Sequence, residues 1–327
     1  MKTVSKVAWL VALSLFLAPT TAFSSKDKRK DPSQIGNRDV AKGVNLYSLE
    51  KEIELGRQLA QQIEKESRIV DDPVVSEYVN RIAQNIARNS DVKVPVTARV
   101  IDDDQVNAFA LPGGYLFVNT GLVRRAGSEA ELAGVIAHEL AHVAARHGTR
   151  QASRGQVASW LTLPLIFMGG WAGYGVQQAA NLGIPLTFLR FSRDFEREAD
   201  MLGIQYLYAA GYDPTAYIDF FERIQALEKT QPGALSKIFL SHPPTDERIA
   251  EAQATIQAVL APQPQYVVNT SEFVDVHGRL ERLLASRKAQ PRDDGRPTLR
   301  RGTAPVDARS GDAPDQDGDR PTLKRTG

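Results

Sequence analysis

The stretch His138-Glu139-Leu140-Ala141-His142 decides how the rest of the chain is interpreted. Ser128 and Glu131 form the pattern of a capping box, which predicts that a helix begins there, contains this pentad and runs to about Arg146. Gly148 follows just beyond that expected end, where glycine commonly terminates a helix. At about 100° per residue, His138 and His142 lie about 40° apart on one helix face, one turn from each other.

Two imidazoles in this arrangement can bind one metal ion. Neutral histidine nitrogens bind Zn²⁺ at about 2.0–2.1 Å, and side chains one turn apart can both reach that distance. Glu139 lies beside the same face, where its carboxylate can accept a proton from water. The alternative is a pair of histidines buried in the core without a metal.

A zinc site also needs a third protein ligand and an open fourth position. The elongated form of the motif, which adds a glycine and a third histidine, is excluded because Ala145 and Gly148 occupy those positions. His147 lies about 140° around the helix from His142, so it is expected to face elsewhere.

Better candidates for the third ligand lie in a second predicted helix, which opens at Ser192 and ends at Gly211. Glu196 and Asp200 share one face at i and i+4, whereas Glu198 lies about 200° from Glu196. One carboxylate could bind the metal while another orients a ligating imidazole. Spacing alone does not rank the three acids, and a solvated acidic helix start is the alternative.

The composition limits the other possibilities. The chain has 327 residues, of which 42% are hydrophobic and 24% charged, so a large buried core is possible and global disorder is excluded. Forty basic residues against 39 acidic ones give a net charge of +1, which argues against nucleic-acid binding. Cysteine is absent, so any metal must be held by His, Asp or Glu.

The two ends of the chain differ from its middle. Residues 1–22 combine a basic start, a short apolar run and small residues, which predicts a cleaved signal peptide and a periplasmic or otherwise exported protein. An uncleaved membrane anchor is the alternative. Residues 23–44 are interpreted as a polar linker, and residues 289–327 have the composition of a disordered, solvated tail.

The region between the ends is predicted to begin with helices over residues 49–66 and from Asp72-Pro73 to about Asn89. Strands are expected over residues 94–101, 107–110 and 115–119, the last two joined as a hairpin. An edge strand there could bind an extended peptide through its main chain, or the sheet could only pack against the helices.

Four motifs in this order resemble one protein family. They are Asn107-Ala108-Phe109-Ala110 with the following Leu-Pro-Gly-Gly, the His138–His142 pentad, the acidic segment Ser192–Asp200, and Ser241-His242-Pro243-Pro244-Thr245. Together they are similar to the zinc metallopeptidase family of the CAAX prenyl protease, the heat-shock protease HtpX and the periplasmic protease BepA. The resemblance spans residues 46–260, but no membrane span follows the signal and no 34-residue tetratricopeptide period is present.

The resemblance implies one Zn²⁺ per chain, held by His138, His142 and Glu196, with Asp200 as the helix-mate of Glu196 and Glu139 as the general base. It also implies that His242 approaches the metal, either covering it or assisting catalysis. Asn107, Ala108, Phe109 and Ala110 correspond to the strand beside the active site.

The expected fold is α+β: a mainly helical, zincin-type metallopeptidase domain over residues 45–262, with a small antiparallel sheet beside the active-site helix. Residues 263–288 are expected to form a small C-terminal extension. The apolar but Gly- and Pro-rich residues 160–191 could form a lid, a contact with a membrane surface or an ordinary insertion.

The function expected from these features is that of an exported zinc endopeptidase acting on unfolded or extended polypeptides, in quality control of envelope proteins. The alternative is a non-catalytic zinc-binding assembly factor or chaperone. An intact Glu139 favours the enzyme, because a purely structural metal site needs no general base.

Overall fold

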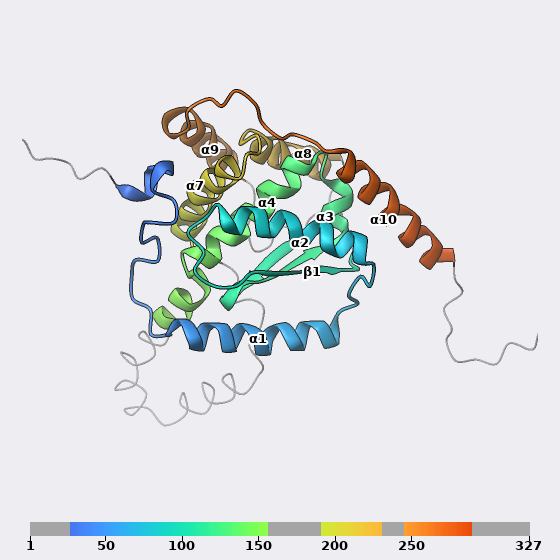
Figure 1. The fold of residues 1–327 in the computed structure, drawn as a ribbon, viewed down its shortest axis with the longest axis horizontal. Coiled ribbons are helices and arrows are strands. Elements are labelled where there is room, and N and C mark those ends of the chain that lie inside the picture. Colours follow the sequence, from blue (N-terminus) through green and yellow to red (C-terminus); the bar gives the residue numbers. More distant parts are fainter. Residues whose placement is uncertain (1–26, 156–190, 231–244, 290–327) are drawn as a thin grey trace, which may run out of the picture. The chain divides into compact units, whose positions relative to one another are not determined.

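The computed structural model describes residues 27–155, 191–230 and 245–289 (Figure 1). The predicted signal peptide, the tail from residue 290, the segment 156–190 and His242 lie outside the described residues. The described residues up to Ala285 form one compact unit.

Two helices open the domain where the sequence predicts them. Helix α1 spans Leu49–Glu66, and the hydroxyl of Ser48 caps it by accepting a hydrogen bond from the Lys51 N–H. Helix α2 spans Pro73–Arg88, and the Asp72 carboxylate accepts from the first free N–H groups. Both helices bury one face, so the sequence-based prediction of amphipathic scaffold helices is confirmed.

A three-stranded sheet lies beside these helices. Its strands are β1 (Thr97–Ile101), β2 (Ala108–Leu111) and β3 (Tyr115–Asn119), in the order β1-β3-β2. Strands β2 and β3 form the expected antiparallel hairpin around η3 (Pro112–Gly114). Strand β1 pairs with β3 in parallel, so the prediction of a wholly antiparallel sheet was wrong. Hydrophobic alternation identifies a strand but carries no information about which neighbour it joins or in which direction.

Helix α4 (Glu129–Ala144) is buried at every position and carries the pentad. It follows the short helix α3 (Thr120–Arg125) and contacts α2, β2, α7 (Arg193–Ala209) and α8 (Ala216–Thr230). Figure 1 shows α4 running through the middle of the domain, between the sheet and α7. A helix enclosed on all sides needs an apolar surface all round, which explains the run of Ala, Leu, Val and Ile around its histidines.

The end of α4 differs from the prediction. The helix stops at Ala144, Arg146 adopts a left-handed conformation with φ of +56°, and residues 147–155 are helical again. Gly148 therefore lies inside the next helical segment. The prediction that Gly148 terminates α4 was wrong. The side chain of Arg146 donates to Glu52 and to the Tyr47 carbonyl, and these bonds hold the unfavourable turn in place.

The C-terminal helices α9 (Asp246–Val259) and α10 (Ser271–Ala289) complete the described fold. Upstream of α1, the short 3₁₀ helices η1 (Lys28–Lys30) and η2 (Pro32–Gln34) lie in the segment predicted as a linker, and within that segment Arg38 and Val40 are buried. Across the residues that the structure describes, no helix combines the length and apolar character that crossing a membrane requires. The α+β prediction, mainly helical with a small sheet, is confirmed apart from the direction of β1.

Candidate metal centre

Three buried side chains from α4 and α7 bring potential ligand atoms together. The Nε2 atoms of His138 and His142 lie 3.1 Å apart, and each lies 3.6 Å from a carboxylate oxygen of Glu196. Ligands of a tetrahedral zinc ion at about 2.0–2.1 Å are separated from one another by about 3.3 Å. Two imidazole nitrogens and one carboxylate at these distances fit zinc in both donor type and spacing, and all three ligand atoms lie within 4.8 Å of one another.

Glu196 reaches this position because α4 and α7 approach closely. A Cβ atom added to Gly203 would lie 3.0 Å from the backbone N and Cα atoms of His138. Glycine at this point therefore lets α7 lie directly against the metal-binding turn of α4. The spacing of the acids left Glu196, Glu198 and Asp200 as open alternatives, and the structure gives each of them a different partner.

Asp200 holds the outer nitrogen of His138. Its Oδ1 lies 3.0 Å from the Nδ1 of His138 and also accepts a hydrogen bond from the Tyr217 hydroxyl. Arg248 donates to both oxygens of Asp200, at 2.8 and 2.6 Å, and lies 3.3 Å from Glu196. Asp200 thus fixes His138 with Nε2 facing the other two ligands, which is the tautomer that zinc needs.

The charges at this site shift the pKa values of its residues. Burial lowers the pKa of His138, but its hydrogen bonds with Asp200 and Glu196 outweigh burial and raise the pKa to about 9. Burial raises the pKa of Asp200, but the charge of Arg248 outweighs it and holds that pKa well below its usual range. Zinc binding at this site would release the proton of His138, so metal binding and proton release are coupled.

The outer nitrogen of His142 has a different kind of partner. The Nδ1 atoms of His142 and His147 lie 2.8 Å apart, and the Nε2 of His147 lies 3.0 Å from Oε2 of Glu198. Our expectation that His147 faces elsewhere was wrong, because it extended α4 past its actual end. The left-handed turn at Arg146 redirects the chain and places His147 against His142.

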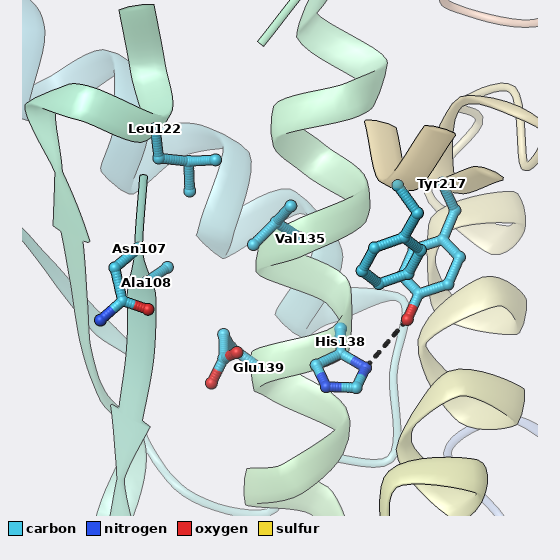
Figure 2. A pocket seen from close by; sticks show the side chains of 8 residues that line it. Asn107, Ala108, Leu122, Val135, His138, Glu139 and Tyr217 are labelled. Atoms are coloured by element: carbon cyan, nitrogen blue, oxygen red, sulfur yellow. Dashed lines mark hydrogen bonds between the residues drawn. The ribbon is translucent and has the colours of Figure 1, made fainter. Parts of the chain in front are cut away.

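Glu139 follows His138 on α4 and contacts strand β2. Its Oε2 accepts a hydrogen bond of 3.1 Å from the N–H of Ala110. Figure 2 shows Glu139 directed from α4 toward Asn107 and Ala108, while His138 is directed to the other side, toward Tyr217. A small cavity adjoins these groups. It is lined by Asn107, Ala108, Leu122, Val135, His138, Glu139, Tyr217 and Phe221.

Sequence reasoning missed Tyr217, Arg248 and the role of His147. Burial raises the pKa of Tyr217 well above its ordinary value, so its hydroxyl stays protonated and can donate to Asp200. No local pattern marks Tyr217 as part of this site, since α8 contributes it from outside the four motifs. Arg248 lies three residues after Thr245, the last residue of the fourth motif, and that position was the one available signal for it.

Comparison with known proteins gives the family of this chain. Residues 73–256 match the family described as peptidase family M48, which covers more than half of the chain. The chain belongs to peptidase family M48. This membership confirms the family resemblance and, at the level of the family, the prediction of a zinc metallopeptidase.

Curated M48 relatives carry names that describe proteases. The chain is 28% identical over 239 residues to the beta-barrel assembly-enhancing protease of Escherichia coli strain K12, covering 70% of this chain and 48% of that protein. It is 29% identical over 258 residues to the protein of the same name in Yersinia pestis, covering 76% and 52%. It is 33% identical over 179 residues to the mitochondrial metalloendopeptidase OMA1 of Schizosaccharomyces pombe, covering 54% and 51%. The chain thus spans about half the length of the relatives it matches.

Proposed function

We propose that this chain is an exported, zinc-dependent endopeptidase that hydrolyses peptide bonds in unfolded or extended envelope proteins. One observation carries the proposal: Glu139 lines the same cavity as the potential ligand His138, and its carboxylate accepts a hydrogen bond from the N–H of Ala110 in strand β2. A proton acceptor in this position shares a cavity with a potential metal ligand and contacts the strand along which a peptide backbone could lie.

The chemistry divides between the metal and the chain. Zinc, when bound, would make water more acidic and polarise the scissile carbonyl. Glu139 would accept the proton of the attacking water and deliver it to the leaving amine. The N–H of Ala110 holds Glu139 toward the strand, so the carboxylate needs little reorientation between the two proton transfers.

Strand β2 offers the backbone groups that an extended substrate would use. Among the described residues, no strand pairs with the second edge of β2. Asn107 accepts from the N–H of Asn119 across the hairpin, and hydrogen-bonded pairs alternate along an antiparallel ladder. Ala108 consequently presents both its N–H and its C=O group to the second edge, and Ala110 presents its C=O, because the N–H of Ala110 donates to Glu139. Backbone pairing there favours extended chains over folded ones and is largely independent of sequence.

The remaining parts of the proposal rest on the sequence alone. Export rests on the signal-like pattern of residues 1–22, and a role for His242 near the metal rests on the family resemblance. The names of the E. coli and Y. pestis relatives, which refer to beta-barrel assembly, favour a role in envelope protein quality control. Contact of residues 160–191 with a membrane surface also remains part of the proposal.

The variant Glu139→Gln tests the proposed chemistry, because it keeps the shape and the hydrogen bond to Ala110 but removes the proton acceptor. We expect it to retain one zinc per chain and to lose about 10²–10⁴-fold in kcat/KM on an unfolded protein substrate. Elemental analysis and a cleavage assay on parent and variant measure both quantities. Equal cleavage by the two proteins would refute Glu139 as the base.

A non-catalytic assembly factor is the second candidate function, and the same variant separates it from the first. If zinc-loaded parent cleaves no unfolded substrate and Glu139→Gln supports envelope assembly as well as the parent does, the assembly factor replaces the peptidase.

A further inference from the structure

A continuous chain of hydrogen bonds leads from His142 to the surface of α7. It runs from His142 Nδ1 to His147 Nδ1 over 2.8 Å, and from His147 Nε2 to Glu198 Oε2 over 3.0 Å. Glu198 then accepts from Arg150 at 3.0 Å and from Arg29 at 2.8 Å. Each link lies within ordinary hydrogen-bond distance, so the chain can form as one connected network.

Zinc binding by His142 would determine which nitrogen carries the proton at each step of this hydrogen-bonded network. If His142 binds zinc through Nε2, its Nδ1 must carry the proton and donate it toward His147. His147 then accepts at Nδ1, and its own proton lies on Nε2, where it donates to Glu198. Glu198 accepts from Arg150 and Arg29 as well as from His147, so positively charged donors surround its carboxylate.

Aromatic packing fixes the orientation of the His147 ring. The ring is completely buried and stacks on Phe195 with centroids 4.3 Å apart and an interplanar angle of 16°. It meets the His142 ring edge-on, with centroids 4.9 Å apart. A ring held on its face by Phe195 and at both nitrogens by polar partners has a single orientation, and it imposes that orientation on His142.

The two histidine ligands are therefore supported unequally. The outer nitrogen of His138 meets the Asp200 carboxylate directly, which is the usual arrangement at zinc sites. For His142, a second imidazole stands between the ligand and its carboxylate. The three acids of α7 fall into three roles: Glu196 lies among the ligands, Asp200 supports His138 directly, and Glu198 supports His142 through His147.

We propose that His147 is a positioning residue of the metal centre, which orients the ring of His142 for zinc and connects it to Glu198. This inference rests on the proposed zinc-dependent function, but it concerns metal affinity and can be measured without any substrate.

Three substitutions separate the two nitrogens of His147. His147→Phe keeps a stacked ring and removes both polar contacts. His147→Asn places an amide oxygen near the position of Nδ1, where it can still accept from His142. His147→Gln places its amide near the position of Nε2, where it can reach Glu198 but not His142. In all three, Glu198 keeps its ion pairs with Arg150 and Arg29.

Zinc dissociation constants, measured by competition with a coloured chelator on the full chain, give the readout. We expect His147→Phe to raise the zinc Kd about 10–100-fold. His147→Asn should recover most of this loss and His147→Gln little of it. Thr149→Val is the matched control, since it removes hydrogen bonds with Glu52 and Asn45 from the same helical segment and leaves the hydrogen bonds of His147 in place. Its zinc Kd should equal that of the parent.

Any of three results would overturn the proposal: a parental Kd for His147→Phe, an equal Kd for the Asn and Gln variants, or a loss in Thr149→Val as large as that in His147→Phe. If His147→Phe does not fold, the comparison of Asn with Gln decides alone. A parent that binds zinc but hydrolyses nothing refutes the proposed function and leaves this inference standing. If the parent hydrolyses peptides and substitutions of His147 leave the zinc Kd unchanged, the proposed function stands and this inference is refuted.

Discussion

Each potential zinc ligand contacts another buried side chain, and charged residues such as Asp200 and Arg248 are among these contacts. Asp200 shows the principle best, because it accepts from His138 and Tyr217 and also forms an ion pair with Arg248. The side chain of Asp200 is 6% exposed and that of Arg248 is 8% exposed, so solvent cannot compensate either charge if the other is removed.

The substitution Asp200→Asn tests this support at the residue scale. The amide oxygen can still accept from His138, but the negative charge that favours the donating tautomer and balances Arg248 is lost. We expect the zinc Kd to rise about 10-fold or more. Zinc competition measures this, and the exposed Asp219→Asn on α8 serves as the control with the same chemical change. An unchanged Kd for Asp200→Asn would mean that its charge does not support the ligand.

The sequence predicted part of this site and could not predict the rest. His138, His142 and Glu139 follow from one motif on one helix, because helical geometry fixes their relative directions within a single turn. The three acids of α7 could be located but not ranked, since their distance to α4 depends on how closely two helices pack. The position of His147 was predicted wrongly because Arg146, which is not a glycine, adopts the left-handed conformation and α4 ends before it. A sequence pattern rarely indicates such a residue.

At the scale of elements, the metal centre depends on the closeness of α4 and α7. Gly203→Val should destabilise the fold by about 1–3 kcal/mol, because the branched side chain would collide with the His138 backbone. It should also weaken zinc binding by moving Glu196 away from the histidines.

The substitution Gly134→Ala on α4 is the matched control. The nearest neighbour of an added Cβ at Gly134 is 3.4 Å away, so this variant should be tolerated and gain up to about 1 kcal/mol of stability from helix propensity. Urea unfolding with zinc titration measures both effects, and parental zinc binding by Gly203→Val would contradict the argument.

The start of α2 provides a pH-dependent element outside the metal centre. Asp72 caps the helix and accepts two bonds from Arg279 of α10, and the bond to Arg279 is the main reason that its pKa lies below the ordinary value of 3.8. A carboxyl group with a lowered folded-state pKa stabilises the fold above its unfolded pKa and loses that contribution as the pH falls through the folded value.

Asp72→Asn should therefore reduce the dependence of stability on pH without removing the cap. Asparagine caps a helix about as well as aspartate, but it does not titrate. Above pH 4 the parent should be more stable, by less than about 1 kcal/mol because Arg279 is half exposed. Below the folded pKa the two proteins should converge. Asp72→Ala, which also loses the cap, should cost about 1 kcal/mol more at every pH. Parallel urea titrations between pH 2 and 7 test this, and a constant difference between parent and Asp72→Asn would contradict it.

The secondary structure was easier to predict than the arrangement of the sheet. Residues 49–66 and Pro73–Arg88 carry their own caps and apolar faces, so local sequence sets their bounds. Strand β1 pairs with β3 and not with β2, the strand that follows β1 in the sequence. This choice of neighbour is set by the tertiary fold and not by the local sequence. Central α4 lacks a polar face, and this signals a buried helix without revealing its neighbours.

At the scale of the whole molecule, residues 27–44 behave as part of the domain. Arg38 forms an ion pair of 2.8 Å with Asp91 in which the two side chains are 1% and 0% exposed. It also donates to Gln205 of α7 and to carbonyl groups of residues 29 and 31, while Asp91 accepts from Tyr206. The segment thereby connects the end of α2 with α7, the helix that supplies Glu196, and through Arg29 it also reaches Glu198.

The substitution Arg38→Met should consequently destabilise the whole domain. It leaves the buried carboxylate of Asp91 without its cation, which costs about 3–5 kcal/mol when a buried pair is broken from one side. Arg57→Gln is the matched control: its ion pair with Glu54 has a similar length of 2.7 Å, but the two side chains are 48% and 49% exposed. Its loss should change the stability little, because solvent screens an exposed ion pair. Urea unfolding of zinc-loaded parent and variants measures the difference. If Arg38→Met costs no more than Arg57→Gln, residues 27–44 lie on the domain without stabilising it, as the linker interpretation of this segment predicts.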